Sequence, residues 1–429
     1  MEQELNRPSL ITCFKQGLPK MAFITEIHRK TILQKLDDLY SEKTRYQKAK
    51  IAGELWKLIF SDSMAAITPN KRGIPELFAY IDEFLEYEDV LFAVDSHYRD
   101  HIIHSIWVML VGFYLIQNFD LYKQIKFSGV IDDIGGTEQS EKCYNKVHGK
   151  LNQFQLPIWF LIALTHDLGY PIQKTKAGNL RMAKMLKNYG FLGLQEFQYS
   201  FTVVNQPAID ILLDSLASAI GCCAKGEYRL VKSQGLRLDA AKTFENTDHG
   251  IMSAYLLQNK IDWITEGLAL SEVEFLPVMR PDVAFNHAVI LQIFDAITSH
   301  TNVNRYYRNL NSMSVLLLLC DEMEEFSRYR QSTITHEWFE AQIRTEVKIE
   351  KTKIRITYTF QDLIRSAELE TNLIGFFDGK ANIMKQRFEL STGELDEIIL
   401  ICKDSTKPNK PECSFVWKSG AEPIRKYPN

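Results

Sequence analysis

The chain lacks paired cysteines. Its seven cysteines are odd in number and scattered, and none of them belongs to a CxxC pair (positions 13, 143, 222, 223, 320, 402 and 413). A disulfide framework needs an even set, and a zinc knuckle needs such pairs. The cysteine usage therefore indicates neither and favours a reducing compartment, so we expect a cytoplasmic protein.

An excess of positive charge is also missing. The 429 residues include 50 Lys and Arg against 54 Asp and Glu, which gives a net charge of −4. Proteins that wrap nucleic acid use clustered basic residues to release counterions. The composition therefore does not indicate a nucleic-acid partner.

The sequence has no apolar run long enough for a membrane helix. The longest run, "IIHSIWVMLVGFYLI" at 102–116, is interrupted by His104, whereas a spanning helix needs about 20 apolar residues. The first residues, MEQELNRPSLITCF, lack the basic-then-apolar order of a signal peptide. We therefore expect a buried helix at 102–116 and no membrane partner.

Helical periodicity dominates the part of the chain before residue 340. Hydrophobic residues make up 45% and charged residues 24% of the chain, which is typical of a soluble globular protein. The spacing predicts one long amphipathic helix over 27–60, a break at 68–75, a helical stretch from 76 to about 120 and a polar insert at 128–150. Four further helices are predicted at 206–220, 248–258, 285–300 and 312–330.

Strand periodicity takes over after residue 340. The stretch "EVKIEKTKIRITYTF" alternates around a charged turn, and "ELDEIILICKD" and "CSFVWKS" are typical of further strands, with a helix at 366–387 between them. We predict a mainly α protein with a small C-terminal α+β domain, divided into an N-terminal helical region at 1–95, a main helical domain at 96–335 and the α+β domain at 336–429.

The stretch "ALTHDLGYP" at 163–171 places two titratable side chains at the end of an apolar helix. Pro157 suits the first turn of that helix, and Gly169 and Pro171 end it, so His166 and Asp167 close it. An imidazole and a carboxylate supply one nitrogen and one oxygen ligand, and the partial negative charge of a helix C-terminus favours a cation. The pair is therefore a candidate metal-binding element.

Other apolar helices carry polar residues that can join this pair. The helix "SHYRDHIIHSIWVMLVG" aligns His97, His101 and His104 on one face. His249 precedes an apolar stretch, His300 ends another, and Asp321 follows the run "SVLLLLC". A carboxylate buried without a partner costs several kcal/mol, so a metal ion is a plausible compensating charge.

In this order, the stretches "RDHIIHSIWVMLVG", "LTHDLGYP", "DHGIMSAYLL", "AITSH" and "LLLLCDEMEEFSR" make the chain resemble the HD superfamily of metal-dependent phosphohydrolases. The resemblance covers about residues 96–330 and implies an HD-type helical bundle core. It also implies a first metal ion held by His104, His166, Asp167 and Asp321, with iron, manganese, magnesium, nickel or zinc as the ion.

The resemblance also implies roles for two further histidines. His249 and His300 are similar to the additional histidines of binuclear members, in which case Asp167 bridges two ions. Alternatively, His249 and Ser253 resemble the HxxxS stretch of dNTP triphosphohydrolases, whose histidine faces the phosphates. On this basis the catalytic candidates are His249, Asp167 and His300.

Several residues have competing interpretations. His101 competes with His104 for the first ligand position, and His97 is a surface or supporting residue. His287 matches no motif, so we interpret it as structural. Asp295 either supports a ligand or pairs with an arginine.

The implied reaction is attack on phosphorus by water that the metal ion has activated. Basic and aromatic residues near the predicted ligands are the candidates for substrate contacts: Arg99, Tyr170, Lys174 and Lys176. The resemblance implies a nucleotide substrate and a homo-oligomer. The C-terminal domain is then expected to serve dimerisation or regulation.

The sequence departs from two subfamily patterns. The dNTP triphosphohydrolases continue as HDxGH, where this chain has Tyr170 and Pro171. The cyclic-di-GMP phosphodiesterases carry an HH pair and a GYP motif farther downstream. This chain lacks both, and its own GYP follows the HD pair directly. We expect dNTPs to be better substrates than cyclic nucleotides, with antiviral defence within the family's range. The alternatives are a cyclic-nucleotide phosphodiesterase, an HD nuclease and a non-catalytic nucleotide-sensing scaffold.

Overall fold

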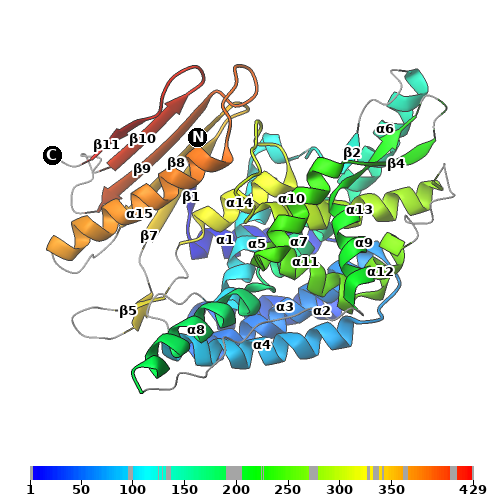
Figure 1. Ribbon diagram of the computed structural model, residues 1–429. Coiled ribbons are helices and arrows are strands. Elements are labelled where there is room, and N and C mark those ends of the chain that lie inside the picture. Colours follow the sequence, from blue (N-terminus) through cyan, green and yellow to red (C-terminus); the bar gives the residue numbers. More distant parts are fainter. Residues whose placement is uncertain are drawn as a thin grey trace. The chain divides into compact units, whose positions relative to one another are not determined.

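The computed structural model is mainly helical, with a small sheet that contains the C-terminal strands (Figure 1). It describes residues 3–94, 100–123, 125–127, 129–131, 137–189, 205–223, 225, 227–269, 279–325, 329–331, 338–340, 343–360, 366–405 and 413–427. The chain divides into two compact units that are not sequential. The first contains Met1–Ser63, Glu88–Lys126 and Val303–Asn429, and the second contains Met64–Tyr87 and Phe127–Asn302.

The three predicted domains follow one another along the chain, whereas these units interleave, and the predicted domain boundaries stay a prediction.

The first unit combines helices with a six-stranded sheet. Its helical elements are α1 (Arg7–Gly17), η1 (Leu18–Lys20), α2 (Glu26–Ser41), the greater part of α3 (Arg45–Ile67), the end of α4 (Ile74–Val94), α5 (His101–Asn118), η2 (Asp120–Tyr122), α14 (Met313–Met323) and α15 (Ser366–Arg387). Its strands are β1 (Gln3–Leu5), β5 (Tyr329–Gln331), β6 (Trp338–Glu340), β7 (Ile343–Ile349), β8 (Lys353–Phe360), β9 (Glu397–Asp404), β10 (Cys413–Lys418) and β11 (Ile424–Lys426).

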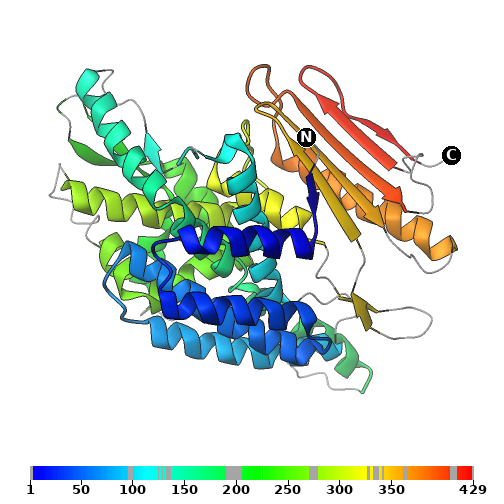
Figure 2. The same cartoon turned by 180° about the vertical axis from the view of Figure 1, so that it is seen from behind.

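The sheet has the order β1-β7-β8-β9-β10-β11. Strands β8 and β9 are parallel and the other pairs are antiparallel, so α15 makes the crossover between two parallel strands. α15 lies along one face of the sheet, and the opposite view shows the strands in front of it (Figures 1 and 2). Four of its residues recur at helical spacing and are fully buried: Leu373, Phe377, Ala381 and Met384.

The second unit is a group of helices with a three-stranded sheet. Its helices are the greater part of α4, α6 (Glu138–Gln153), α7 (Gln155–Thr165), α8 (Tyr170–Lys187), α9 (Gln206–Leu216), α10 (Gln234–Glu245), α11 (His249–Lys260), α12 (Asp262–Ala269) and α13 (Pro281–Ser299). Its strands are β2 (Val130–Ile131), β3 (Ser218–Cys222) and β4 (Tyr228–Lys232).

Most predicted elements are confirmed. The break at 68–75, the helices that became α7, α11, α13, α14 and α15, and strands β7 to β10 all appear. Helix α5 is the helix among the described residues that is long and apolar enough to cross a membrane, and 83% of its 18-residue window is buried. The burial of α5 confirms the buried helix that the sequence predicts at 102–116.

Five predictions of secondary structure are wrong. The single helix at 27–60 is two helices, because the Glu42 carboxylate accepts hydrogen bonds from the backbone N–H groups of Lys43 and Thr44 and ends α2 without Pro or Gly. The polar insert at 128–150 contains most of α6, which buries Cys143, Val147 and Leu151 on one face. The predicted helix at 206–220 ends at Leu216, and β3 follows it. The predicted helix at 312–330 ends at Met323, and β5 begins at Tyr329. Strands β1 to β5 all precede residue 340.

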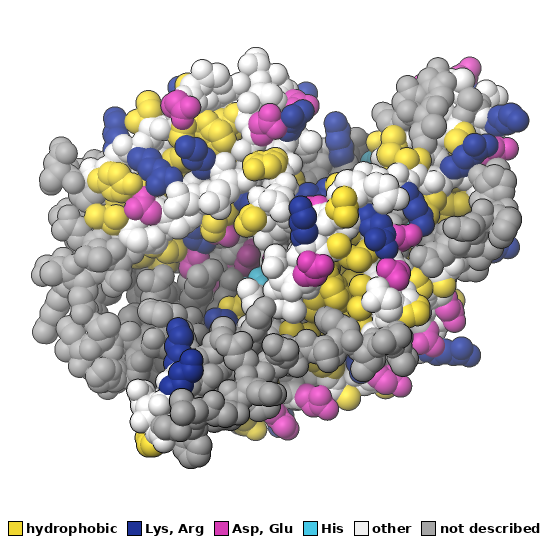
Figure 3. All heavy atoms as spheres, in the orientation of Figure 1, with side chains coloured by type: hydrophobic (Ala, Val, Ile, Leu, Met, Phe, Trp, Pro, Cys, Tyr) yellow, Lys and Arg dark blue, Asp and Glu magenta, His cyan; other side chains and the backbone are white. Residues whose placement is uncertain are grey.

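The face drawn in Figure 3 carries charges of both signs. Lys and Arg side chains are interspersed with Asp and Glu among the described residues, in keeping with the balanced composition.

Candidate metal centre

The candidate centre of the second unit is built from three helix ends. His166 is the C-cap of α7 and Asp167 follows it directly, His249 is the first residue of α11, and His300 is the C-cap of α13. His166 is fully buried, and Asp167 and His300 are 6% and 5% exposed. Residues that are up to 134 positions apart in the sequence therefore share one buried site.

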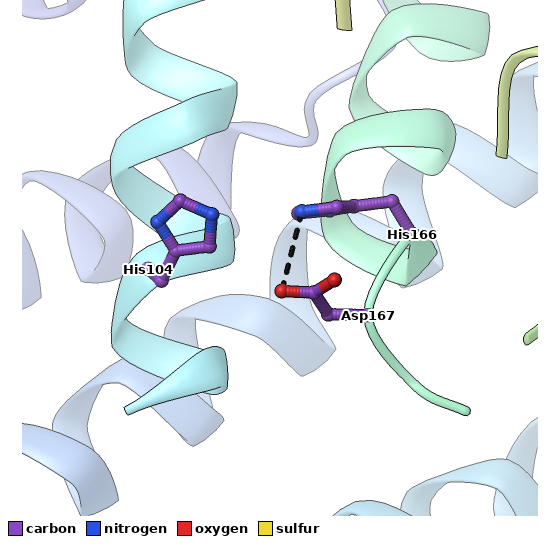
Figure 4. A group of neighbouring side chains, drawn as sticks. All are labelled: His104, His166 and Asp167. Atoms are coloured by element: carbon purple, nitrogen blue, oxygen red, sulfur yellow. Dashed lines mark ion pairs between the residues drawn. The ribbon is translucent and has the colours of Figure 1, made fainter. Parts of the chain in front are cut away.

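All three imidazoles direct their Nε2 atoms at the Asp167 carboxylate. The distances to its oxygens are 3.4 Å from His166, 3.3 Å from His249 and 3.7 Å from His300. The first of these ion pairs is the dashed line in Figure 4. Ligand atoms of Asp167, His249 and His300 all lie within 4.8 Å of one another, so this buried group can hold a metal ion.

The other nitrogen of each ring faces a hydrogen-bond acceptor. His166 Nδ1 lies 2.8 Å from the carbonyl oxygen of Ala163, and His300 Nδ1 contacts that of Ile297. His249 Nδ1 lies 2.6 Å from Oε1 of Gln173 on α8. An Nδ1–H that donates to such an acceptor leaves the lone pair of a neutral ring on Nε2.

This arrangement fits a bound cation. Three Nε2 lone pairs and a carboxylate repel one another unless a proton or a metal ion lies among them. Metal-ligating histidines usually donate their second N–H to a carbonyl or carboxylate, as these rings do. Ligand bonds of about 2.0–2.2 Å leave neighbouring donor atoms roughly 3–3.5 Å apart, close to the spacings seen here.

Asp167 is held in its ionised form. Burial by itself raises the pKa of this carboxyl, but charge on His166 and hydrogen bonds from His249 and His300, which act when protons rather than a metal ion occupy the Nε2 atoms, together lower the pKa well below its usual value. A metal ligand must be deprotonated, so this environment keeps the carboxylate available.

Close packing fixes the three helix ends relative to one another. A Cβ atom on Gly169 would lie 2.3 Å from the carbonyl oxygen of His249, and one on Gly250 would lie 2.5 Å from that of Ile297. The fully buried Ser253 Oγ accepts a hydrogen bond from the Gly169 N–H at 2.7 Å and lies 2.8 Å from the carbonyl oxygen of His166. The glycines and this serine therefore hold α11 against the turn after α7 and against α13.

The first unit contains a second imidazole–carboxylate group. His104, on α5, places Nε2 at 2.9 Å from Oδ1 of Asp321 and Nδ1 at 2.6 Å from Oε2 of Glu324. His104 and Glu324 are fully buried, and the Asp321 side chain is 18% exposed. Figure 4 also draws the His104 side chain on its helix.

The rival first ligand, His101, has a different partner. Its Nδ1 and its backbone N–H both lie near Oε1 of the buried Glu88, at 3.0 and 2.6 Å. Between the two candidates, it is His104 that contacts the predicted ligand Asp321. His97 and Arg99 lie outside the described residues.

The remaining candidates fall into two groups. Tyr170 packs edge-on against His249 with ring centroids 5.1 Å apart, and Lys174 Nζ lies 5.1 Å from the centre of the Tyr170 ring. The side chain of Lys176 lies outside the described residues. His287 is fully buried near Ser218, as expected of a structural histidine, and Asp295 is half-buried on α13.

Each unit thus brings together its own part of the predicted set. The second unit joins His166, Asp167, His249 and His300, and the first joins His104 and Asp321. That all of these residues serve one metal centre stays a prediction. Comparison with family models, curated proteins and solved structures finds no match for this chain.

Two residues that contact the candidate histidines were not predicted from the sequence. Glu324 lies three residues after Asp321, a spacing that places both on one side of a helix, and this was the available signal. Gln173 gave no signal, because an exposed glutamine on a helix is ordinary.

Proposed function

We propose that this protein is a metal-dependent phosphohydrolase with an HD-type helical core that acts on nucleotides, with dNTPs as the first candidates. One observation carries the proposal: three imidazole Nε2 atoms surround the buried Asp167 carboxylate while their Nδ1 atoms face acceptors. The resemblance of the sequence motifs to the HD superfamily supplies the reaction class.

His166, Asp167 and His300 would hold the ion, with His249 as a further ligand or a proton carrier. His104 and Asp321 are the further ligands that the sequence predicts. A donor set rich in imidazole favours iron, zinc or nickel, whereas magnesium and manganese prefer oxygen ligands. The bound ion supplies a Lewis acid that activates water and polarises a phosphoryl oxygen.

The residues around the ion have separable tasks. His249 has the most exposed of the three rings, at 17% against 0% and 2% for His166 and His300. When protonated, it offers a proton at Nε2 to the oxygen that leaves phosphorus. Lys174 lies beside Tyr170 on the same helix and supplies positive charge for a substrate phosphate.

The experiment combines metal content with a substrate panel. The purified protein, Asp167→Ala and the exposed control Asp282→Ala are analysed for bound metal and incubated with dNTPs, cyclic nucleotides, cyclic dinucleotides and single-stranded DNA in the presence of Mn²⁺. We expect near-stoichiometric metal and dNTP hydrolysis in the wild type and control, and loss of both in Asp167→Ala.

The other outcomes separate the alternatives. Hydrolysis of cyclic nucleotides alone indicates a phosphodiesterase, and cleavage of DNA indicates a nuclease. Equal metal content in all three proteins with no hydrolysis would overturn the proposal and favour a nucleotide-sensing scaffold. Homo-oligomerisation and cytoplasmic location stay predictions.

A further inference from the structure

The end of α14 carries four acidic residues in two pairs. In the segment "CDEMEE", Asp321 and Glu324 are three residues apart, and so are Glu322 and Glu325. Asp321 and Glu322 lie in the last turn of α14, and Glu324 and Glu325 follow its end at Met323. The structure gives each pair its own cationic or imidazole partner within the first unit.

The first pair meets His104. Its Nε2 lies 2.9 Å from Asp321 and its Nδ1 lies 2.6 Å from Glu324, so one ring is bound at both nitrogens.

The second pair meets Lys380 of α15. The ammonium nitrogen lies 2.7 Å from Oε2 of Glu322 and 2.6 Å from Oε1 of Glu325, and it also donates to the backbone carbonyl of Glu322 at 2.6 Å. The Lys380 side chain is 6% exposed and that of Glu325 is 0% exposed. This is a buried ion network.

The sheet secures the same turn through the backbone. The hydroxyl of Tyr358, on β8, donates to the Glu322 carbonyl at 2.8 Å, and that of Thr345, on β7, donates to the Met323 carbonyl at 3.1 Å. The last carbonyls of a helix lack partners within the helix. Here residues of the sheet and of α15 supply them.

From this arrangement we infer that Lys380 is a positioning residue that holds Asp321 and Glu324 against His104. Four carboxylates within five residues repel one another in a buried setting, and one ammonium group offsets part of the charge of the pair that faces away from His104. The C-terminal α+β region is then part of the architecture of the candidate centre. Its link to catalysis rests on the proposed function, whereas the placement of His104 does not.

The test follows His104 in the metal-free full-length protein by NMR. The hydrogen-bonded Nδ1–H proton of His104 is assigned by its absence from His104→Gln. We expect Lys380→Met to shift or abolish this signal and Lys380→Arg to restore it. Lys385→Met, the same change at an exposed lysine of α15, leaves it unchanged.

Binding of Mn²⁺ alone supplies a second readout. We expect affinity about 10- to 100-fold lower in Lys380→Met than in Lys385→Met, the range typical of residues that orient ligands.

A second variant covers the case in which Lys380→Met does not fold. Glu325→Leu/Lys380→Met replaces the buried pair by apolar side chains, a change that proteins often tolerate. A wild-type His104 signal and wild-type Mn²⁺ affinity in this folded variant would overturn the inference. A displaced His104 signal combined with a protein that hydrolyses nothing would instead refute the proposed function alone.

Discussion

The two imidazole–carboxylate groups are built in opposite ways. In the second unit, three imidazoles surround one carboxylate, and every Nδ1 faces an uncharged acceptor. In the first unit, one imidazole lies between two carboxylates. The group in the second unit places several lone pairs close together, whereas the group in the first unit gives both nitrogens of one ring a hydrogen-bond partner.

The difference predicts which group depends on metal. His104 already has acceptors for both ring nitrogens, so its contacts persist without an ion when the ring is protonated. The rings around Asp167 present Nε2 lone pairs to an anion, which is favourable only with a cation or protons among them. Four predictions test this contrast, from the largest expected effect to the smallest.

Removing Glu324 should cost the most stability. Glu324→Leu leaves the fully buried His104 without its 2.6 Å partner, and breaking a buried pair on one side typically costs about 3–5 kcal/mol. Chemical denaturation of the metal-free protein measures the free energy of unfolding. The exposed control Glu394→Leu should stay within about 0.5 kcal/mol of the wild type, and an equally small change for Glu324→Leu would contradict the pairing.

His287 provides a third kind of buried histidine, for which no carboxylate partner is found among the residues that the structure describes. The pKa of His287 is lowered to about 4. Burial is the main cause and the charge of Lys232 adds to it, and together they outweigh a hydrogen bond to the backbone of Gly267 that raises the pKa. In the unfolded chain His287 takes up a proton near pH 6.5, whereas in the folded protein it does so only near pH 4. The contribution of the neutral, buried ring to the free energy of unfolding is therefore complete above pH 6.5 and is lost as the pH falls from 6.5 to 4. The loss reaches about 3 kcal/mol.

Denaturation of the metal-free protein across this pH range checks the sign. His287→Gln should show a shallower decline below pH 6.5 than the wild type, and identical slopes would count against a neutral, buried His287.

Asp167→Asn should separate metal binding from folding. An amide can donate to the Nε2 lone pairs that a carboxylate repels, so the metal-free variant should be as stable as the wild type or slightly more stable. At a metal concentration 100 times the Kd, the wild type should gain about 2.7 kcal/mol, and Asp167→Asn should gain almost none.

Thermal unfolding with and without added Mn²⁺ measures both quantities. A metal-free Asp167→Asn protein that is strongly destabilised would mean that Asp167 is paired with protonated imidazoles rather than poised for an ion.

Gln173 tests the importance of the Nδ1 acceptors. Gln173→Leu removes the only side-chain acceptor among the three described Nδ1 contacts, so His249 loses its fixed tautomer. Metal affinity should fall about 10- to 100-fold. Titration with Mn²⁺ measures it, with Gln206→Leu, an exposed glutamine of α9, as the control. Gln173→Glu retains an acceptor and should restore binding.

Local sequence predicted the parts of the fold that depend on nearby residues. The helix that ends at His166 and Asp167, the break at 68–75 and the strand pair β7–β8 follow from apolar spacing and from Pro and Gly. The split between α2 and α3 was missed because the Glu42 carboxylate accepts hydrogen bonds from the next two backbone N–H groups and ends the helix without Pro or Gly. Strand β1 was missed because three residues carry too little periodicity and because its partner, β7, lies more than 300 residues away.

The sequence by itself determined which residues are able to bind an ion, since imidazoles and carboxylates at the ends of apolar helices can be read from composition and spacing. Tertiary structure decided which nitrogen each ring presents, because the acceptors at Nδ1 are set by helix-end carbonyls and by Gln173. It also decided that Glu324 faces His104, 220 residues away, and that Lys380 pairs with the neighbouring carboxylates of Glu322 and Glu325. Such pairings depend on distances of about 3 Å between side-chain atoms of different elements. Tertiary packing fixes these distances, and no local sequence pattern encodes them.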